Sequence, residues 1–150
     1  MGTPYTAVFD AYFAKVKDDI YQVMDAEELE MELIKVLEAA LPRFLYPKVD
    51  LSLRDATGFT ETLTNEEIQI IASLMLLVWI EARLTDVEVT RQVFRDHDFQ
   101  LTSQASHLRA LMALKSDLKT SCRDLMHAYS KVENRKPNFS GLAGGSDYEN

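Results

Sequence analysis

Residues 63–84 read LTNEEIQIIASLMLLVWIEARL. Thr64 stands three positions before Glu67, the spacing of a capping box, in which each side chain accepts a hydrogen bond from the other residue's backbone N–H. From Leu74 to Ile80 every residue is apolar, and a helix that is apolar all round must be covered on every side. Polar residues interrupt the run before it reaches the roughly 18 apolar residues of a membrane span. The stretch therefore predicts the central helix of the fold, with core residues Ile71, Leu74, Leu77, Val78 and Trp79.

Composition indicates one acidic globular domain. The chain has 150 residues, of which 47% are hydrophobic, and this length suits a single domain with a sizeable core. It carries 24 acidic and 16 basic residues, a net charge of -8. That balance opposes general nucleic-acid binding and adhesion to anionic membranes. A lone cysteine excludes an internal disulfide, and the N-terminus has no secretory pattern, so we expect a cytoplasmic protein.

Two amphipathic helices are predicted before the central one. The first covers Tyr5 to about Lys17 or Tyr21, with apolar residues at helical spacing. The second is capped by Asp25 and runs to Phe44, where Pro42 should close it. Glutamates fill the outer face of the second helix, and their simplest role is a solvated surface: Glu27, Glu28, Glu30, Glu32 and Glu38. The sharper alternative is a face that recognises a basic partner.

Two further helices are predicted after residue 84. Thr85 and Glu88 repeat the capping-box spacing, which predicts a short separate helix over residues 86–94. The last helix should run from Ser103 to Val132, because apolar residues recur at three- and four-residue spacing over roughly four heptads. A helix of this length should pack antiparallel to the central helix or protrude beyond the domain. The predicted class is mainly α, a bundle of four to five helices.

The segment from Pro47 to Leu63 alternates apolar and polar residues and contains a turn. Alternation at Val49, Leu51 and Leu53 predicts a short strand, and DATG at residues 55–58 predicts the turn. A small hairpin or an ordered loop is expected. An isolated hairpin is marginal in water, so it needs the helices or a neighbouring subunit behind it.

The last residues differ in character from the helical domain. We assign residues 1–133 to that domain and residues 134–150, NRKPNFSGLAGGSDYEN, to an extended C-terminal arm. Pro137 ends any helix, and three glycines exclude a regular element. Phe139 and Leu142 are apolar anchors that suit an arm ordered by a partner. A disordered tail is the equally weighted alternative.

No catalytic, metal or cofactor motif is present. Asp96, His97 and Asp98 form a polar cluster, but no second ligand pair has a recognised metal spacing. His107 and His127 lie about 30 Å apart on one helix and cannot share an ion. Cys122 falls on an apolar face, as a core residue does. We expect a protein that is not an enzyme and needs no cofactor.

Three stretches resemble the neck, or head-tail connector (adaptor), proteins of tailed bacteriophages. They are LTNEEIQIIASLMLLVWI at residues 63–80, DFQLTSQASHL at 98–108 and RKPNFSGLAGG at 135–145. The resemblance extends from about Leu41 to Gly145 and contains no catalytic fingerprint. It implies a structural virion protein, assembled in the host cytoplasm and located in the virion neck. It also implies a homo-oligomeric ring of about twelve copies that extends the DNA channel.

The resemblance further implies specific partners. The ring joins the portal protein to a stopper or tail protein, and DNA passes through without specific binding. The arm would dock on the portal or on a neighbouring subunit through Pro137, Asn138, Phe139 and Leu142. A second interface would lie in the loop residues Asp55, Thr57, Gly58 and Phe59. No membrane is involved.

Two other functions remain open from the residues. One is a helical interaction or regulatory module that binds a basic partner through its acidic face. The other is an enzyme that uses the 96–98 cluster with a metal. The first predicts a dispensable tail and no ring, and the second predicts metal retained through dialysis.

Overall fold

The computed structural model is a mainly α-helical bundle, which confirms the predicted class. It describes residues 2–16, 24–93 and 101–132, with side chains over 2–16, 24–86 and 106–132. Its elements are β1 (Thr3–Pro4), α1 (Tyr5–Phe13), α2 (Ala26–Ala40), the 3-10 helix η2 (Leu41–Arg43), β2 (Gly58–Phe59), α3 (Asn65–Val93) and α4 (Leu101–Val132).

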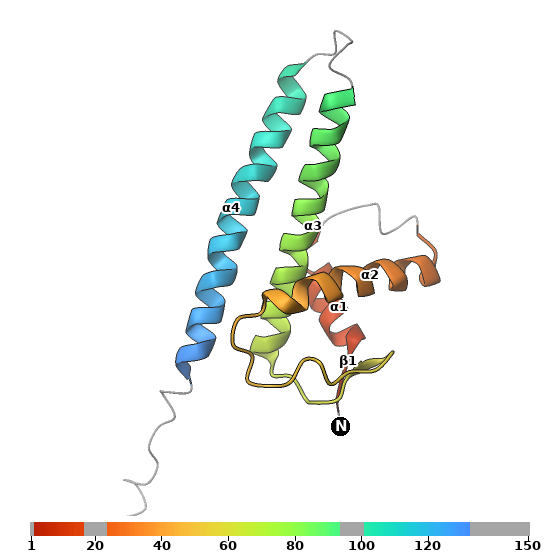
Figure 1. The fold of residues 1–150 in the computed structure, drawn as a ribbon, viewed down its shortest axis with the longest axis vertical. Helices are drawn as coiled ribbons and strands as arrows, with labels where there is room; N and C mark the ends of the chain where they lie inside the picture. Colours follow the sequence, from red (N-terminus) through yellow and green to blue (C-terminus); the bar gives the residue numbers. More distant parts are fainter. Residues whose placement is uncertain (1, 17–23, 94–100, 133–150) are drawn as a thin grey trace, which may run out of the picture.

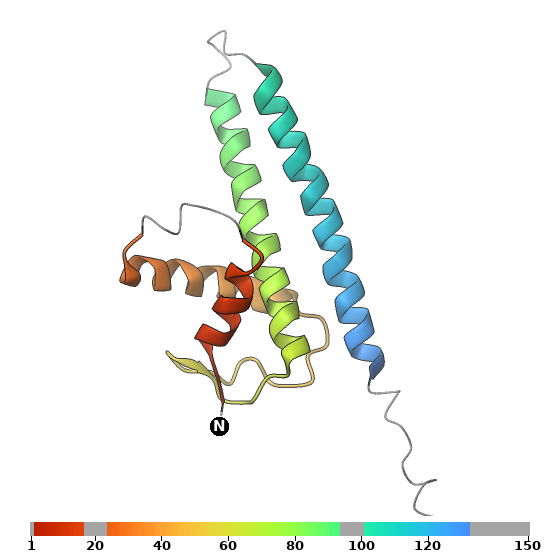
Figure 2. The same ribbon diagram turned by 180° about the vertical axis from the view of Figure 1, so that it is seen from behind.

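Helix α3 is the central element of the bundle. Helix α4 runs beside it in the opposite direction, and α1 and α2 pack against its first half (Figures 1 and 2). The α3–α4 hairpin extends well past α1 and α2, so only its lower half belongs to the compact body. The sequence offered antiparallel packing and protrusion as alternatives for the last helix, and in the structure the two occur together.

The capping box that opens α3 forms as predicted. The Thr64 N–H donates to Glu67 Oε2 at 2.7 Å, and the Glu67 N–H donates to Thr64 Oγ1 at 3.2 Å. Burial along α3 is uneven: Ile71, Leu74 and Leu77 are buried, whereas Val78 and Trp79 are half-buried. The predicted core thus holds fully for the first three residues, while the last two lie at its edge.

Residues Asn65–Asp86 of α3 have the length and apolar composition of a membrane-spanning helix. A central helix of a packed bundle meets the same criteria. In this structure α1, α2 and α4 all contact α3, as expected for a core helix.

The predicted end of the central helix at Leu84 is wrong. Helix α3 continues without a break to Val93, and the separate helix over 86–94 does not form within the described part of the chain. Thr85 does not cap a new helix. Its Oγ1 donates to the Glu81 carbonyl at 3.0 Å inside α3, an alternative that a threonine hydroxyl has within a helix. The capping-box spacing alone could not distinguish these two bonds.

The first two helices end earlier than predicted. Helix α1 stops at Phe13, and the next described residues include buried Val16. Helix α2 is capped as predicted, since Asp25 Oδ1 accepts from the Glu28 N–H at 2.9 Å. It ends at Ala40 and tightens into the 3-10 turn around Pro42, because proline has no N–H to continue the α-helical ladder.

Residues 47–63 take the second of the two expected forms, an ordered loop. The alternating residues 49–53 form no strand, and Leu51 is buried in a turn. Strand β2 pairs antiparallel with β1 at the N-terminus, with Thr3 opposite Phe59, and an isolated bridge joins Arg54 to Phe59. The Leu63 N–H also donates to Thr3 Oγ1 at 2.7 Å. The N-terminus therefore supplies the main strand partner that the loop lacks on its own.

Candidate functional site

A buried polar network fixes the C-terminal half of α4 to the start of α3. The Tyr129 hydroxyl donates to Glu67 Oε1 at 2.7 Å and accepts from the Lys48 N–H at 2.9 Å. The Lys48 Nζ donates to the Tyr129 carbonyl at 3.0 Å and lies 4.4 Å from the ring centroid. Glu67 is only 3% exposed, yet both of its carboxylate oxygens accept hydrogen bonds.

This network is structural in character. Burial, and then the hydrogen bond to Glu67, raise the pKa of Tyr129 to about 12. A phenol with so high a pKa stays protonated at neutral pH and acts as a donor. Phe44 packs edge-on against the same ring at 5.4 Å between centroids. These contacts join α4 to the start of α3 and to the loop before it, so the network holds α4 in place.

Cys122, His107 and His127 are the described side chains that the sequence raised as candidates for catalysis or metal binding. Cys122 is 2% exposed, and burial raises the pKa of its thiol, which disfavours the nucleophilic thiolate. Among the residues that the structure describes, no three His, Cys, Asp or Glu side chains are grouped to hold a metal. His107 and His127 are exposed on α4. The 96–98 cluster lies outside the described residues.

The loop predicted as a second interface is only partly on the surface. Asp55 and Thr57 are exposed, and Asp55 Oδ1 accepts from the Thr57 N–H and hydroxyl, both at 2.7 Å. These bonds, the hydroxyl first, lower the pKa of Asp55. Gly58 and Phe59 are buried, and Phe59 packs edge-on against Tyr5 at 5.3 Å. Gly58 and Phe59 thus pack inside the single chain, and Asp55 and Thr57 are the members of the predicted interface that lie on its surface.

The predicted arm, with Pro137, Asn138, Phe139 and Leu142, lies outside the described residues. The element that leads to it is described, and it exposes an apolar stripe. We define the apolar stripe of α4 by residues at spacings of four and seven, of which Leu118 is half-buried against the core: Leu114, Leu118, Leu125 and Val132. Leu114 and Val132 are each 50% exposed, and Leu125 is 36% exposed. Large apolar side chains in a row on one helix mark a candidate contact surface.

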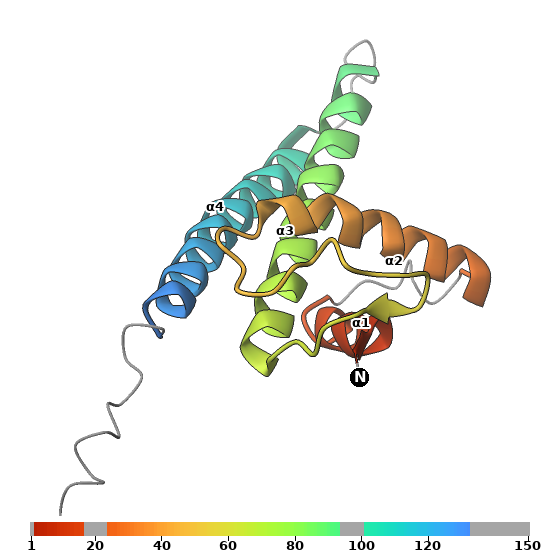
Figure 3. The same ribbon diagram turned by 60° about the horizontal axis from the view of Figure 1, so that its bottom comes forward.

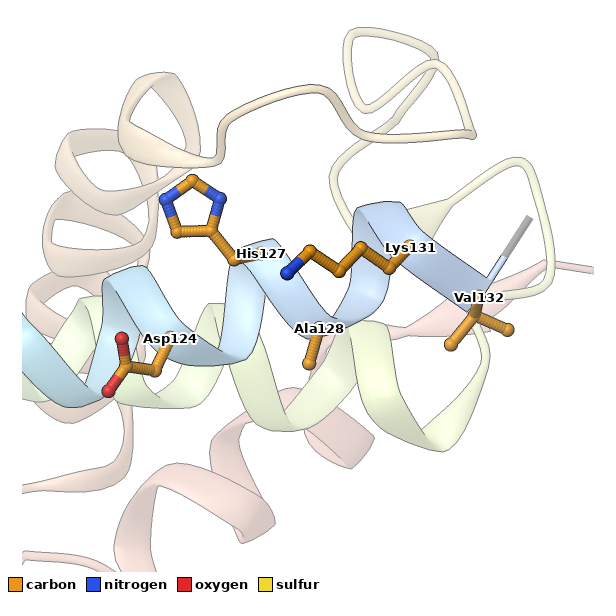
Figure 4. Close-up of a pocket in the computed structure, with 5 residues that line it drawn as sticks. All are labelled: Asp124, His127, Ala128, Lys131 and Val132. Atoms are coloured by element: carbon orange, nitrogen blue, oxygen red, sulfur yellow. The ribbon is translucent and has the colours of Figure 1, made fainter. Parts of the chain in front are cut away.

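A shallow depression lies at the same end of α4. Its described lining belongs entirely to that helix: Asp124, His127, Ala128, Lys131 and Val132 (Figure 4). The side chains fan out around one helix and do not converge on a point. This is a surface feature beside the apolar stripe, without the enclosure of a small-molecule site.

A larger groove lies between α3 and α4. Its lining residues mix an apolar floor with two lysines: Glu81, Leu84, Thr85, Leu108, Met112, Lys115, Ser116 and Lys119. We call this the hairpin groove. Glu81 is held by Arg43 at 2.6 Å, and that hydrogen bond lowers the pKa of Glu81. The charges of Arg43, Lys115 and Lys119 also lower the pKa of Glu81, and these three cations outnumber the one carboxylate of the groove.

The outer face of α2 is acidic. Five glutamates and one lysine fall within Ala26–Ala40. Met31, in their midst, is 57% exposed. We call Glu27, Glu28, Met31 and Glu38 the acidic ridge. The far end of α2 points away from α4 (Figure 3).

Comparisons with known proteins give no assignment. No family model, no curated protein and no solved structure matches this chain. The candidate surfaces therefore stand on the chain's own geometry. Sequence reasoning identified the glutamates of α2 but missed the hairpin groove, because its two walls are about thirty residues apart and meet only in the folded hairpin.

Proposed function

We propose that this protein is an assembly component of a tailed-bacteriophage neck, forming a ring that joins the portal to the tail or stopper. The observation that carries the proposal is the exposed apolar stripe on the protruding helix α4, which ends at Val132, immediately before the arm. Such a stripe suits a protein that buries its surface in a larger structure. The resemblance of residues 63–80, 98–108 and 135–145 to neck adaptors supplies the identity of that structure.

The stripe and the arm are continuous along the chain. Leu125 and Val132 occupy the last part of α4, and the arm begins directly after it. A partner that captures the arm would therefore meet these two residues next. We assign the portal contact to the arm together with this end of the stripe. In a ring, many copies of such a weak contact form at once, so their combined affinity for the portal is high.

The acidity of the chain is compatible with this role. A net charge of -8 repels the phosphates of passing DNA. Such a protein is a structural component without enzymatic activity or a cofactor. It would be located in the virion neck after assembly in the host cytoplasm.

The test is binding to a tailed-bacteriophage portal protein. Native mass spectrometry of the mixture should show portal rings carrying this protein in a ring-like copy number. Changing Leu125 and Val132 to Ser should weaken that binding, while changing Leu53 to Ser should not. Leu53 is a matched control because it is also exposed, at 48%, but lies in the loop before α3. Absence of binding to the portal at every protein concentration tested would refute the proposal.

A second function is favoured by the acidic ridge. Its exposed glutamates could recognise a basic partner in a monomeric regulatory module. That protein would bind basic peptides without forming a ring. Loss of peptide binding in Glu27→Lys, together with no portal binding in the unmodified chain, would support this alternative.

A further inference from the structure

We propose that the hairpin groove of one copy binds the acidic ridge of the next copy. This inference rests on the proposed function for its biological setting, because it names the surfaces through which copies would meet in the ring. The contact itself is argued from charge, apolar exposure and position within the described residues.

Charge is distributed very unequally between the two elements. Helix α4 carries five basic side chains against two acidic ones, in a chain whose net charge is negative. Helix α2 carries five acidic side chains against one basic one. Lys115 and Lys119 form no salt bridge with any residue the structure describes. Opposite charges on two separate surfaces of one chain steer copies of it together.

The apolar parts of the two surfaces also match. Met112 is 57% exposed in the groove, beside Leu84 and Leu108. Met31 is exposed to the same extent on the ridge. Its unbranched side chain adapts to an irregular apolar pocket. Seating Met31 against Met112 would remove both from water and bring Glu27 and Glu28 toward the two lysines.

The one lysine of α2 does not remove the charge complementarity between the two surfaces. The Lys35 Nζ lies 3.8 Å from Glu32 Oε2 in the same helix. The acid in the groove is likewise paired, since Glu81 is bound to Arg43. Counted with these pairs, α2 keeps the net negative charge of four glutamates and the groove keeps the positive charge of its two lysines.

The positions of the two surfaces require a head-to-tail contact. The ridge lies on a helix whose free end points away from α4, whereas the groove lies between α3 and α4 (Figures 1 and 3). A copy that uses its ridge on one neighbour keeps its groove for another. Contacts of this heterologous kind form a ring where the rotation between copies closes and an open filament where it does not.

Charge reversal tests the contact directly. Sedimentation velocity would follow self-association of the full chain carrying Glu27→Lys with Glu28→Lys, or Lys115→Glu with Lys119→Glu. Either double variant should associate about tenfold more weakly than the unmodified chain. Circular dichroism should be unchanged, because the altered side chains lie on the surface or the groove rim. Lys131→Glu is the matched control, on the same helix but about 18 Å from Lys119 by the helical rise.

Mixing the two double variants is the decisive measurement. In an equimolar mixture the reversed ridge meets the reversed groove, and the two original surfaces also remain complementary. Association should then return, with the two variants alternating. If neither variant associates less than the unmodified chain, or if the mixture fails to recover, the inference is overturned.

The outcome is separable from that for the proposed function. If the variants self-associate normally and the chain still binds the portal as a ring, this contact is refuted and the neck assignment stands. The opposite result is that the chain does not bind the portal, while its variants lose self-association and regain it on mixing. That result would refute the neck assignment and support the contact between copies.

Discussion

Tyr129 and Glu67, which are 62 residues apart, are joined by a buried hydrogen bond of 2.7 Å from the phenol to Oε1. Glu67 uses its other oxygen to cap α3, through the 2.7 Å bond from the Thr64 N–H. One carboxylate therefore both starts the central helix and positions α4 against it. The register of the long hairpin depends on this shared side chain.

Removing the hydroxyl of Tyr129 should lower the free energy of unfolding. In Tyr129→Phe the Lys48 N–H and Glu67 Oε1 both lose a partner in a buried setting. Leaving buried polar groups unsatisfied costs about 1–3 kcal/mol. Urea unfolding followed by circular dichroism measures the change. Tyr46→Phe is the control, because Tyr46 is 82% exposed and its hydroxyl removal should change stability by less than about 0.5 kcal/mol.

The raised pKa of Tyr129 predicts that the folded protein loses stability at high pH. The pKa of Tyr129 is raised from about 10 in the unfolded chain to about 12 in the folded one. Stability from a raised pKa is fully present below the unfolded value and is lost as the pH rises through the folded value. The stability advantage of the unmodified chain over Tyr129→Phe should therefore shrink between pH 10 and pH 12. An advantage that is constant across this range would contradict the assigned pKa.

Truncations along α3 should follow the observed burial. Leu74 is 2% exposed, so Leu74→Ala should cost about 2–5 kcal/mol in free energy of unfolding. Trp79 is half-buried, with the Arg83 guanidinium 5.3 Å from the ring centroid. Its truncation should cost less than the roughly 3–5 kcal/mol of a fully buried tryptophan. Denaturant unfolding of both variants gives the ranking, and a cost for Trp79→Ala above that range would place it in the core after all.

Gly58 should not tolerate a side chain. A Cβ at this position would collide with the Thr3 carbonyl oxygen and would lie 2.8 Å from Pro4 Cα, both of them backbone atoms. Gly58→Ala should therefore force β1 and β2 apart and cost about 1–3 kcal/mol, as overpacking does. Thermal unfolding measures this cost. Ala56→Ser, two residues earlier at an exposed position, should have almost no effect.

Deletion of the arm should leave the fold intact and abolish binding to the portal. A chain that lacks residues 138–150 should keep its helical circular-dichroism signal, because the described core lies within residues 3–129. Under the proposed function it should no longer bind the portal, since Phe139 and Leu142 would be gone. Native mass spectrometry with the portal protein checks this. Binding that survives the deletion would shift the portal contact from the arm to the stripe alone.

Signals that act over a few residues were readable from the sequence. The caps at Asp25 and Thr64 join atoms three residues apart, so their spacing alone predicted both helix starts correctly. The apolar run at residues 74–80 predicted a helix that the other helices surround. The same local reasoning failed at Thr85, where two bonds of similar range compete and only the continuing helix selects one.

The sequence by itself thus determined the helical class, the central helix and the acidity of α2. The tertiary structure decided which surfaces are left for partners. It buried Phe59 against Tyr5 and joined Glu67 to Tyr129. It also opened the groove between Leu84 and Met112. The physical reason is range: hydrogen bonds and periodicity within a helix are set by neighbours in the chain, whereas burial depends on residues that only the complete packing brings together.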